Sequence, residues 1–293
     1  MSGNEYTEDL RSYARAQRKT RAFRILVCVM LGIMSLLPFL LLFVNATRES
    51  NAIQSGVTLI PGIHLLDNLA TLNQKSQGIG INFSRALLNS LMIAVPYTLL
   101  SVYFSSMAAY AIHVYRFRMR KFAWGFILAV MIVPNTVSAI GFYRFMLKLH
   151  LTNSYIPLIL PAIATPAVVF FMRQYFKSTL SLEMVEAARI DGSGELHTFN
   201  TIVLPLAKPA LATQAIFQFI ASWNNLFIPA LLLSTDSKKT LPMFVQVLKG
   251  EQFRTDYGVV YLGLAATILP LFVVYFLLSK YIVAGVALGG VKE

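Results

Sequence analysis

The chain has 293 residues, of which 56% are hydrophobic and only 13% are charged, and its formal net charge is +12. Charged residues make up about 25% of a typical soluble domain, so this composition excludes an ordinary globular protein. The excess of Lys and Arg follows the topology of a membrane protein, as shown below, and nucleic-acid binding is not needed to explain it.

Six stretches of the chain contain no Asp, Glu, Lys or Arg, and each is at least 22 residues long. A helix needs roughly 20 apolar residues to cross the hydrocarbon core of a bilayer. The stretches lack the strict alternation of barrel strands, so the sequence predicts an all-α, polytopic membrane protein with six transmembrane helices. The predicted spans are 25–47, 86–115, 122–143, 149–172, 209–235 and 257–279.

Residues 1–24 form a polar, basic tail with a plausible helix start at Thr7-Glu8-Asp9. Two interpretations stay open: the tail sets the topology by lying on anionic lipid, or it contacts a cytoplasmic partner. The first span, 25–47, is longer than the core of a signal peptide, so we expect a retained anchor. It holds Cys28, the only cysteine, which rules out a disulfide within the chain.

The remaining organisation follows from the loops. Residues 48–85 are expected to form an extracytoplasmic loop, residues 86–283 a five-helix core, and residues 284–293 a C-terminal tail. Sixteen of the 25 Lys and Arg residues fall on the side of the two termini. Because cytoplasmic loops carry the excess of Lys and Arg, both termini are predicted to be cytoplasmic.

A polar loop at 181–205 interrupts this apolar chain on the predicted cytoplasmic side. Ser181 can cap a helix that starts at Leu182, and Asp191-Gly192-Ser193-Gly194 should end that helix, because Gly adopts the left-handed conformation of a helix stop. A second short helix, about Glu195 to Val203, then leads to Pro205. The loop is therefore predicted to be a helix–turn–helix elbow.

The elbow carries a spaced motif: Glu186-Ala187-Ala188, three residues, Gly192, nine residues, then Ile202-Val203-Leu204-Pro205. It resembles the cytoplasmic coupling loop of permease subunits in ATP-driven, binding-protein-dependent (ABC) importers. Shorter matches over about 20–293 resemble the smaller permease of maltose-type carbohydrate importers. These are Asn89-Ser90, Leu151 to Tyr155, Trp223-Asn224-Asn225, Thr240-Leu241-Pro242 and the ending Ala284 to Lys292.

The resemblance implies a type I ABC importer permease fold in a bacterial inner membrane. It implies as partners an ABC ATPase dimer, which binds ATP and Mg, a second and different permease, and an extracytoplasmic solute-binding protein. In that family the elbow sits in a groove of the ATPase and the C-terminal tail reaches the ATPase interface. The residues implied for coupling are Glu183, Glu186, Ala187, Ala188, Asp191 and Gly192.

Two features of this resemblance leave alternatives. The family commonly has Pro where this chain has Ser181; both residues suit a helix start, so altered rigidity without loss of function is expected. The elbow could also pack only against its own chain. The loop after the fifth span is implied to reach the binding protein, and its alternative is a solvated turn. The residues concerned are Ser234, Thr235, Asp236, Ser237 and Lys238.

The sequence also lacks the groups that other functions need. No Gly-Lys pair exists for a phosphate-binding loop, and the four His residues lie in different segments, so no catalytic or metal site and no cofactor bound by this chain are predicted. All thirteen acids lie outside the predicted spans, which counts against an ion-coupled secondary transporter. The chain is therefore predicted to be a permease subunit that is not itself an enzyme. The alternatives are an ion-coupled secondary transporter and a non-transporting scaffold.

Neutral residues are the remaining candidates for a substrate path. Asn can donate and accept hydrogen bonds to hydroxyl groups, and aromatic rings can stack on sugars. The candidates are Tyr143, Trp223, Asn224 and Asn225, and the alternative for each is a hydrogen bond between helices or an interfacial anchor.

Overall fold

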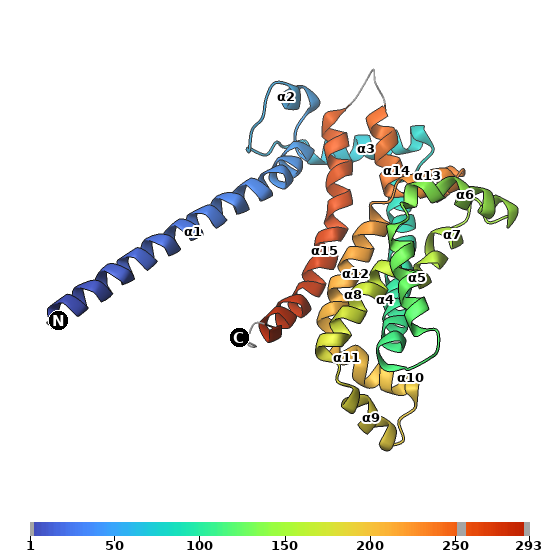
Figure 1. The fold of residues 1–293 in the computed structure, drawn as a ribbon. Coiled ribbons are helices and arrows are strands. Elements are labelled where there is room, and N and C mark those ends of the chain that lie inside the picture. Colours follow the sequence, from blue (N-terminus) through green and yellow to red (C-terminus); the bar gives the residue numbers. More distant parts are fainter. Residues whose placement is uncertain (1–2, 251–255, 290–293) are drawn as a thin grey trace. The chain divides into compact units, whose positions relative to one another are not determined.

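The computed structural model describes residues 3–250 and 256–289, and the described chain is helical, with no strand (Figure 1). Its contacts divide it into two compact units. One unit comprises residues up to 70 together with 256–265, and the other comprises the remaining residues from 71 onward.

The first unit contains a long N-terminal helix. Its elements are α1 (Gly3–Ala46), α2 (Ser50–Gln54), the start of α3 (Leu65–Ile79) and the start of α15 (Tyr257–Gly289). Asn68 Nδ2 donates to the carbonyl oxygens of Ala46 (2.9 Å) and Arg48 (3.0 Å). A Cβ at Gly258 would lie 2.5 Å from the Arg48 oxygen, so only glycine fits there. Helix α1 covers both the predicted tail 1–24, from Gly3 onward, and most of the predicted anchor 25–47 without a break. The predicted loop 48–85 contains α2 and α3.

The second unit is built around one helix. Its elements are the rest of α3, α4 (Phe83–Val114), α5 (Arg120–Ile132), α6 (Asn135–Lys148), α7 (Ile156–Ile159), the 3₁₀ turn η1 (Leu160–Ala164), α8 (Pro166–Thr179), α9 (Leu182–Ile190), α10 (Glu195–Thr198), the π-helical turn η2 (Phe199–Val203), α11 (Leu204–Leu206), α12 (Lys208–Trp223), α13 (Phe227–Leu232), the 3₁₀ turn η3 (Asp236–Lys238), α14 (Leu241–Gly250) and the rest of α15. Helix α4 packs against α8, α12 and η1. Its buried face is rich in Ala and Ser, which lets helix backbones approach closely.

Within residues 3–250 and 256–289, four helices are long and apolar enough to cross a membrane, and up to six spans result if each of two bent helix pairs counts as one. The four are Thr20–Ala46, Phe83–Val114, Ile156–Thr179 and Tyr257–Tyr281. The bent pairs are Arg120–Ile132 with Val137–Lys148, at 104°, and Glu195–Leu206 with Lys208–Trp223, at 84°. The all-α, polytopic prediction is confirmed.

The span boundaries differ from those that the charge-free stretches predict. Span 122–143 is not one straight helix, because Pro134 forces Val133 into an extended conformation (φ −72°, ψ 120°) and ends α5. Span 149–172 begins instead at Ile156, after a turn in which Asn153 has φ +55°. Span 209–235 breaks after Trp223. In the predicted tail 284–293, α15 continues to Gly289, and 290–293, including Lys292, lie outside the described residues.

Candidate functional site: a helical elbow and an apolar-walled cavity

Helix α9 begins and ends by the local rules that the sequence predicted. Ser181 is extended, and its Oγ accepts a hydrogen bond from Met184 N at 3.3 Å, so α9 starts at Leu182. Gly192 has φ +80° and donates its N–H to the Arg189 oxygen at 3.0 Å. Ser193 N–H reaches the Ala188 oxygen at 2.9 Å. These two bonds form a Schellman motif, which requires a left-handed residue at Gly192.

The elbow is anchored to the membrane helices by its apolar side. Val185 of α9 and Phe199 of η2 are buried in one cluster with Tyr110 of α4 and Phe176 of α8. The rings of Tyr110 and Phe199 lie 5.4 Å apart between centroids. Because burying such side chains is worth about 1.5–3 kcal/mol each, the elbow should move with α4 and α8 as one body.

The opposite face of α9 is exposed. Glu183, Glu186, Ala187 and Ile190 share this face at helical spacing, and Ile190 is 86% exposed. Ala188, also implied for coupling, does not belong to this face: its side chain is 6% exposed and faces inward, so it packs against its own chain and offers no partner surface.

Asp191 is exposed at the C-terminal end of α9. Sequence reasoning also missed an apolar component of the elbow surface, Ile190 together with Leu196, which is 65% exposed. Helical spacing from the buried positions could have found Ile190.

A polar clamp joins the two halves of the elbow to the end of α4. Arg189 Nε lies 2.8 Å from Glu195 Oε1, and Tyr115 Oη donates to Glu195 Oε2 at 2.5 Å. The hydrogen bonds from Tyr115 and Arg189 lower the pKa of the Glu195 carboxyl. Glu195 lies in the elbow, before the bend that leads into α12. Burial and the bonded carboxylate raise the pKa of Tyr115, and the same carboxylate raises the pKa of Arg189. No motif in the sequence points to this contact, because Tyr115 and Glu195 are 80 residues apart in the chain.

A cavity of about 350 Å³ lies between α4, α6, α7, η1, α12 and α13. Ser138, Ser222 and Asn225 supply hydrogen-bonding groups to walls that are otherwise mostly apolar, and Tyr97 supplies a phenol that sequence reasoning missed. Asn225 Oδ1 also accepts a hydrogen bond from Ile228 N at 3.3 Å, which fixes the amide at the start of α13.

The other predicted path residues do not line this cavity. Trp223 is 1% exposed, donates Nε1–H to the Thr267 oxygen at 2.8 Å and stacks on Phe219 with centroids 5.5 Å apart. The prediction that the Trp223 ring stacks on a sugar is therefore wrong for this conformation. The ring is buried in protein, and its N–H already has a partner. Tyr143 is half-buried against an apolar cluster, and Asn224 is exposed at the end of α12.

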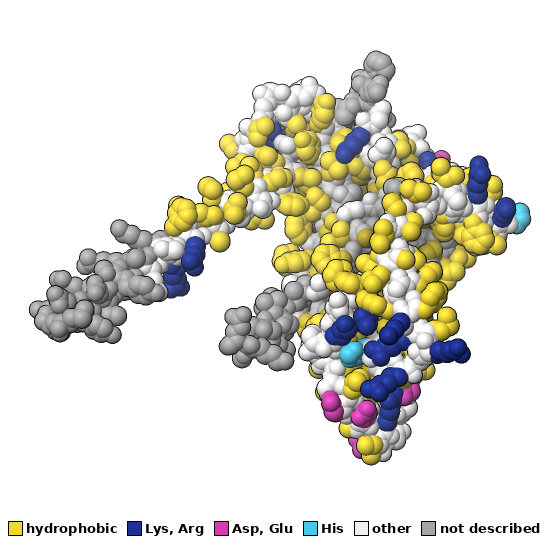
Figure 2. Space-filling model, in the orientation of Figure 1, with side chains coloured by type: hydrophobic (Ala, Val, Ile, Leu, Met, Phe, Trp, Pro, Cys, Tyr) yellow, Lys and Arg dark blue, Asp and Glu magenta, His cyan; other side chains and the backbone are white. Residues whose placement is uncertain are grey.

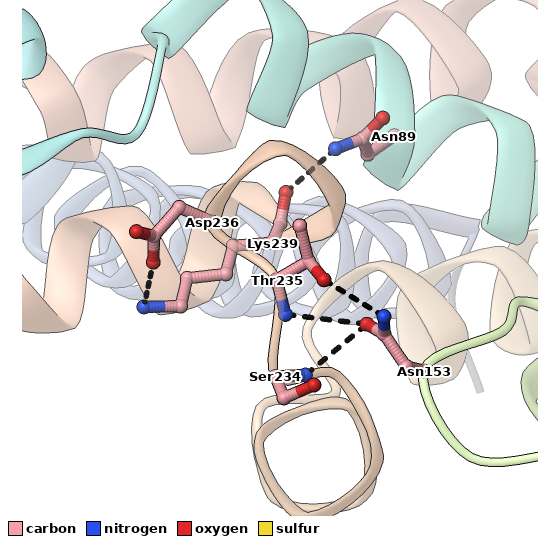
Figure 3. Close-up of polar contacts among 6 residues, drawn as sticks. All are labelled: Asn89, Asn153, Ser234, Thr235, Asp236 and Lys239. Atoms are coloured by element: carbon pink, nitrogen blue, oxygen red, sulfur yellow. Dashed lines mark hydrogen bonds and ion pairs between the residues drawn. The ribbon is translucent and has the colours of Figure 1, made fainter.

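Two asparagines, Asn153 and Asn89, hold the predicted binding-protein loop (Figure 3). Asn153 Oδ1 accepts from the backbone N–H groups of Ser234 (3.3 Å) and Thr235 (3.2 Å), and its Nδ2 donates to Thr235 Oγ1 at 2.7 Å. Asn153 O accepts from Lys238 Nζ at 2.5 Å. The loop is exposed at Ser234 to Ser237, yet it is not a freely solvated turn.

The same loop is tied to the start of α4. Asn89 Nδ2 donates to the carbonyl oxygens of Ser237 and Lys239, both at 2.9 Å, and Ser90 Oγ accepts from Leu241 N at 2.9 Å. Asp236 pairs with Lys239 at 2.7 Å (Figure 3). Three short motifs that are scattered in the sequence, at 89–90, 151–155 and 240–242, thus meet at one loop, which we term the stapled loop (Ser234–Lys239).

Known proteins that resemble this chain identify its family. Residues 101–287 match the family described as "Binding-protein-dependent transport system inner membrane component". The chain belongs to this family. It is 35% identical to the arabinooligosaccharides transport system permease protein AraQ of Halalkalibacterium halodurans, over 89% of this chain and 93% of that protein. It is 33% identical to the sn-glycerol-3-phosphate transport system permease protein UgpE of Escherichia coli, over 88% and 92% respectively.

A solved structure supports the same assignment. The chain superposes with a TM-score of 0.75 and 26% identity on a chain from the crystal structure of a bacterial ABC transporter involved in the import of the acidic polysaccharide alginate. The match covers 90% of this chain and 98% of the other. The protein therefore has the type I importer permease fold predicted from the resemblance.

Membership of the family decides between the functional alternatives. The chain is a multi-pass, inner-membrane permease subunit of an ABC importer, and ATP hydrolysis belongs to a separate subunit. A secondary transporter that works alone and a non-transporting scaffold are both disfavoured by this assignment. Among the residues that the structure describes, no group of three or more His, Cys, Asp or Glu side chains could hold a metal ion.

Proposed function

We propose that this permease imports a sugar or oligosaccharide that an extracytoplasmic solute-binding protein delivers, in a complex with a second, different permease and an ATPase dimer that binds ATP and Mg. The names of AraQ and of the alginate importer support a carbohydrate substrate. UgpE, whose named substrate is a phosphorylated polyol, widens the class to small polyhydroxylated compounds.

The observation that carries the proposal is the two-sided elbow. Its outer face offers Glu186, Ala187 and Ile190 to a partner, while Val185 and Phe199 belong to the cluster that holds α4 and α8. When the ATPase dimer closes on ATP, it would displace the outer face. Because the inner face is packed against α4 and α8, these helices would follow, and the permease would change between inward- and outward-facing states.

The proposed orientation places the elbow and both termini in the cytoplasm and the stapled loop outside. The Lys and Arg excess on the side of the termini supports it. The stapled loop would then present Ser234, Thr235, Asp236, Ser237 and Lys238 to the binding protein from a fixed position. A surface that is already ordered loses less entropy on binding than a mobile loop would.

Within the membrane, the substrate would pass the cavity that Ser138, Ser222 and Asn225 line. Neutral amides and hydroxyls can replace the water around sugar hydroxyls without the desolvation cost of a charge. Asn224, at the end of α12, and Tyr143, on α6, do not line this cavity, and they would meet the substrate at other stages of the cycle. Trp223 would support the path by packing.

Affinity purification of the permease from its native membrane in mild detergent, followed by mass spectrometry, tests the assembly. We expect an ATPase and a second, different permease to be recovered with it. Reconstitution of that complex with its binding protein should give ATP-dependent uptake of a carbohydrate. A permease that is reproducibly recovered alone as a stable species, or that catalyses uptake alone in liposomes, would contradict the proposal.

A further inference from the structure

Six cations lie after the end of α4, at the start of α5 and in the second half of α8, and we term them the interfacial cluster. They are Arg116, Arg118, Arg120, Lys121, Arg173 and Lys177. The sequence contains no Asp or Glu between Asp67 and Glu183, so none of these helices can supply a counter-charge. Figure 2 shows Lys and Arg side chains gathered on this face, above the acidic tip of the elbow.

Three of these cations, Arg120, Arg173 and Lys177, lie around His113 near the end of α4. Arg120 Nη2 donates to the His113 oxygen at 3.2 Å, and His113 Nε2 lies 3.2 Å from the Leu180 oxygen that follows α8. The charges of Arg120, Arg173 and Lys177 all act on the His113 ring. Helix α5 packs against α8. Like charges on neighbouring elements repel one another, and an anion among them would relieve that repulsion.

Arg173 of this cluster is held against an aromatic ring. Its guanidinium carbon lies 3.9 Å from the centroid of the Trp124 ring, which stacks on Phe170 at 5.8 Å. Its Nε is buried without a hydrogen-bond partner, and among the described residues Arg173 forms no ion pair. The planar guanidinium is therefore fixed on the indole with donors still unused, and such a fork suits a phosphate group.

Large apolar side chains are exposed between the cations. Met119 is 59% exposed, Phe122 65% and Phe126 60%, and the Phe122 and Phe126 rings stack along the outer face of α5. This stripe continues from the basic turn along α5, the first half of a bent helix pair that counts as one candidate span. A surface that combines cations with an apolar stripe at the membrane boundary fits a phospholipid, which offers a phosphate and an acyl chain together.

We propose that Arg173, Trp124 and the cations around them form a binding site for the phosphate headgroup of an anionic phospholipid, with the acyl chains along Phe122 and Phe126 of α5. In the orientation proposed above, this lipid belongs to the cytoplasmic leaflet. The site does not depend on the coupling role of the elbow.

Trp124 itself can report on the site, because the chain has only two tryptophans. In a Trp223→Phe background, the full-length permease in detergent micelles is titrated with brominated phosphatidylglycerol or brominated phosphatidylcholine, both of which quench tryptophan fluorescence on contact. Each Lys or Arg near an anionic headgroup is worth about a fivefold preference. We expect the anionic lipid to quench Trp124 at about one-fifth of the mole fraction that the zwitterionic lipid needs, or less.

Arg173→Gln should lower this preference about fivefold. Arg85→Gln, at an exposed arginine near the start of α4 and outside the cluster, is the matched control and should leave the preference unchanged. Equal quenching by the two lipids, or equal effects of Arg173→Gln and Arg85→Gln, would overturn the proposal.

A second measurement avoids the tryptophan substitution. The otherwise wild-type complex and its Arg173→Gln form are purified from native membranes, and the phospholipids that they retain are quantified by mass spectrometry. The Arg173→Gln form should retain less phosphatidylglycerol and the same amount of zwitterionic lipid. If instead the lipids are unchanged and less ATPase is recovered, the cluster faces an acidic protein surface and the lipid site is refuted.

Discussion

Gly192 sits at the one elbow position where the backbone requires a glycine, and its replacement tests whether elbow geometry transmits motion. Its φ of +80° would place a Cβ in open space, so a substitution there causes no clash. The cost is conformational. Holding an L-residue in the left-handed backbone region destabilises the turn by about 1–2 kcal/mol, and a β-branched residue costs more. Gly192→Val should therefore strain the turn without disturbing the packing of the membrane helices.

The strained residue can return to negative φ only by giving up the two bonds that close α9. These are Ser193 N–H to the Ala188 oxygen and Gly192 N–H to the Arg189 oxygen. Each bond contributes about 0.5–1.5 kcal/mol. Either way the native turn is disfavoured by roughly 1–3 kcal/mol, which changes its population relative to an altered turn by about fivefold or more.

The assay compares ATP hydrolysis with substrate uptake by the complete importer in proteoliposomes. We expect Gly192→Val to insert and assemble but to take up less substrate per ATP hydrolysed. Gly194→Ala is the matched control, because Gly194 has φ −70° and open space around it, so Ala fits there without strain. Normal coupled uptake by Gly192→Val, or equal loss in Gly194→Ala, would refute the proposed role of the turn.

Three further predictions concern single side chains. Glu186→Lys reverses a charge on the outer face of α9 and should reduce the ATPase retained on purification, whereas Glu49→Lys, at an exposed acid in the first unit, should not. Asn153→Ala removes the acceptor for two stapled-loop amides and should speed their hydrogen exchange about fivefold or more; Asn153→Asp keeps the acceptor and should protect them. Trp223→Phe, which loses one hydrogen bond, should lower stability by about 1 kcal/mol and leave the KM for substrate unchanged, whereas Trp223→Ala should cost about 3–5 kcal/mol. A raised KM in Trp223→Phe would restore the sugar-platform interpretation.

The elbow could be predicted from sequence because its structure depends on neighbours in the chain. A serine cap at Ser181 and a left-handed glycine at Gly192 act within four or five residues, and both are found where local chemistry puts them. The helix that starts at Leu182 needs no distant contact to be defined. The inward position of Ala188 could not be seen, because it depends on packing against the rest of the chain.

Charge-free stretches predicted the existence of spans but not their ends. A stretch without charges can lie in a bilayer, but it need not be one helix. A helix ends where a residue such as Pro interrupts its backbone hydrogen bonds. Pro134 breaks a stretch that contains no charge, and α8 extends through Arg173 and Lys177 because these long side chains can bring their charges to the membrane surface. Trp223 was misread for a related reason: its hydrogen-bond partner, Thr267, is 44 residues away in the chain.

Helix α4 connects the two surfaces that this permease would present to its partners. Near its C-terminal end Tyr110 packs on Phe199 of the elbow, and near its N-terminal end Asn89 holds the stapled loop. At 1.5 Å per residue the 32-residue helix is about 48 Å long, enough to cross the membrane. A displacement of the elbow must therefore move the stapled loop as well, unless α4 bends within itself. Pro96 is the one residue inside α4 that lacks the N–H needed for an unbroken helix, so any internal bend is expected there.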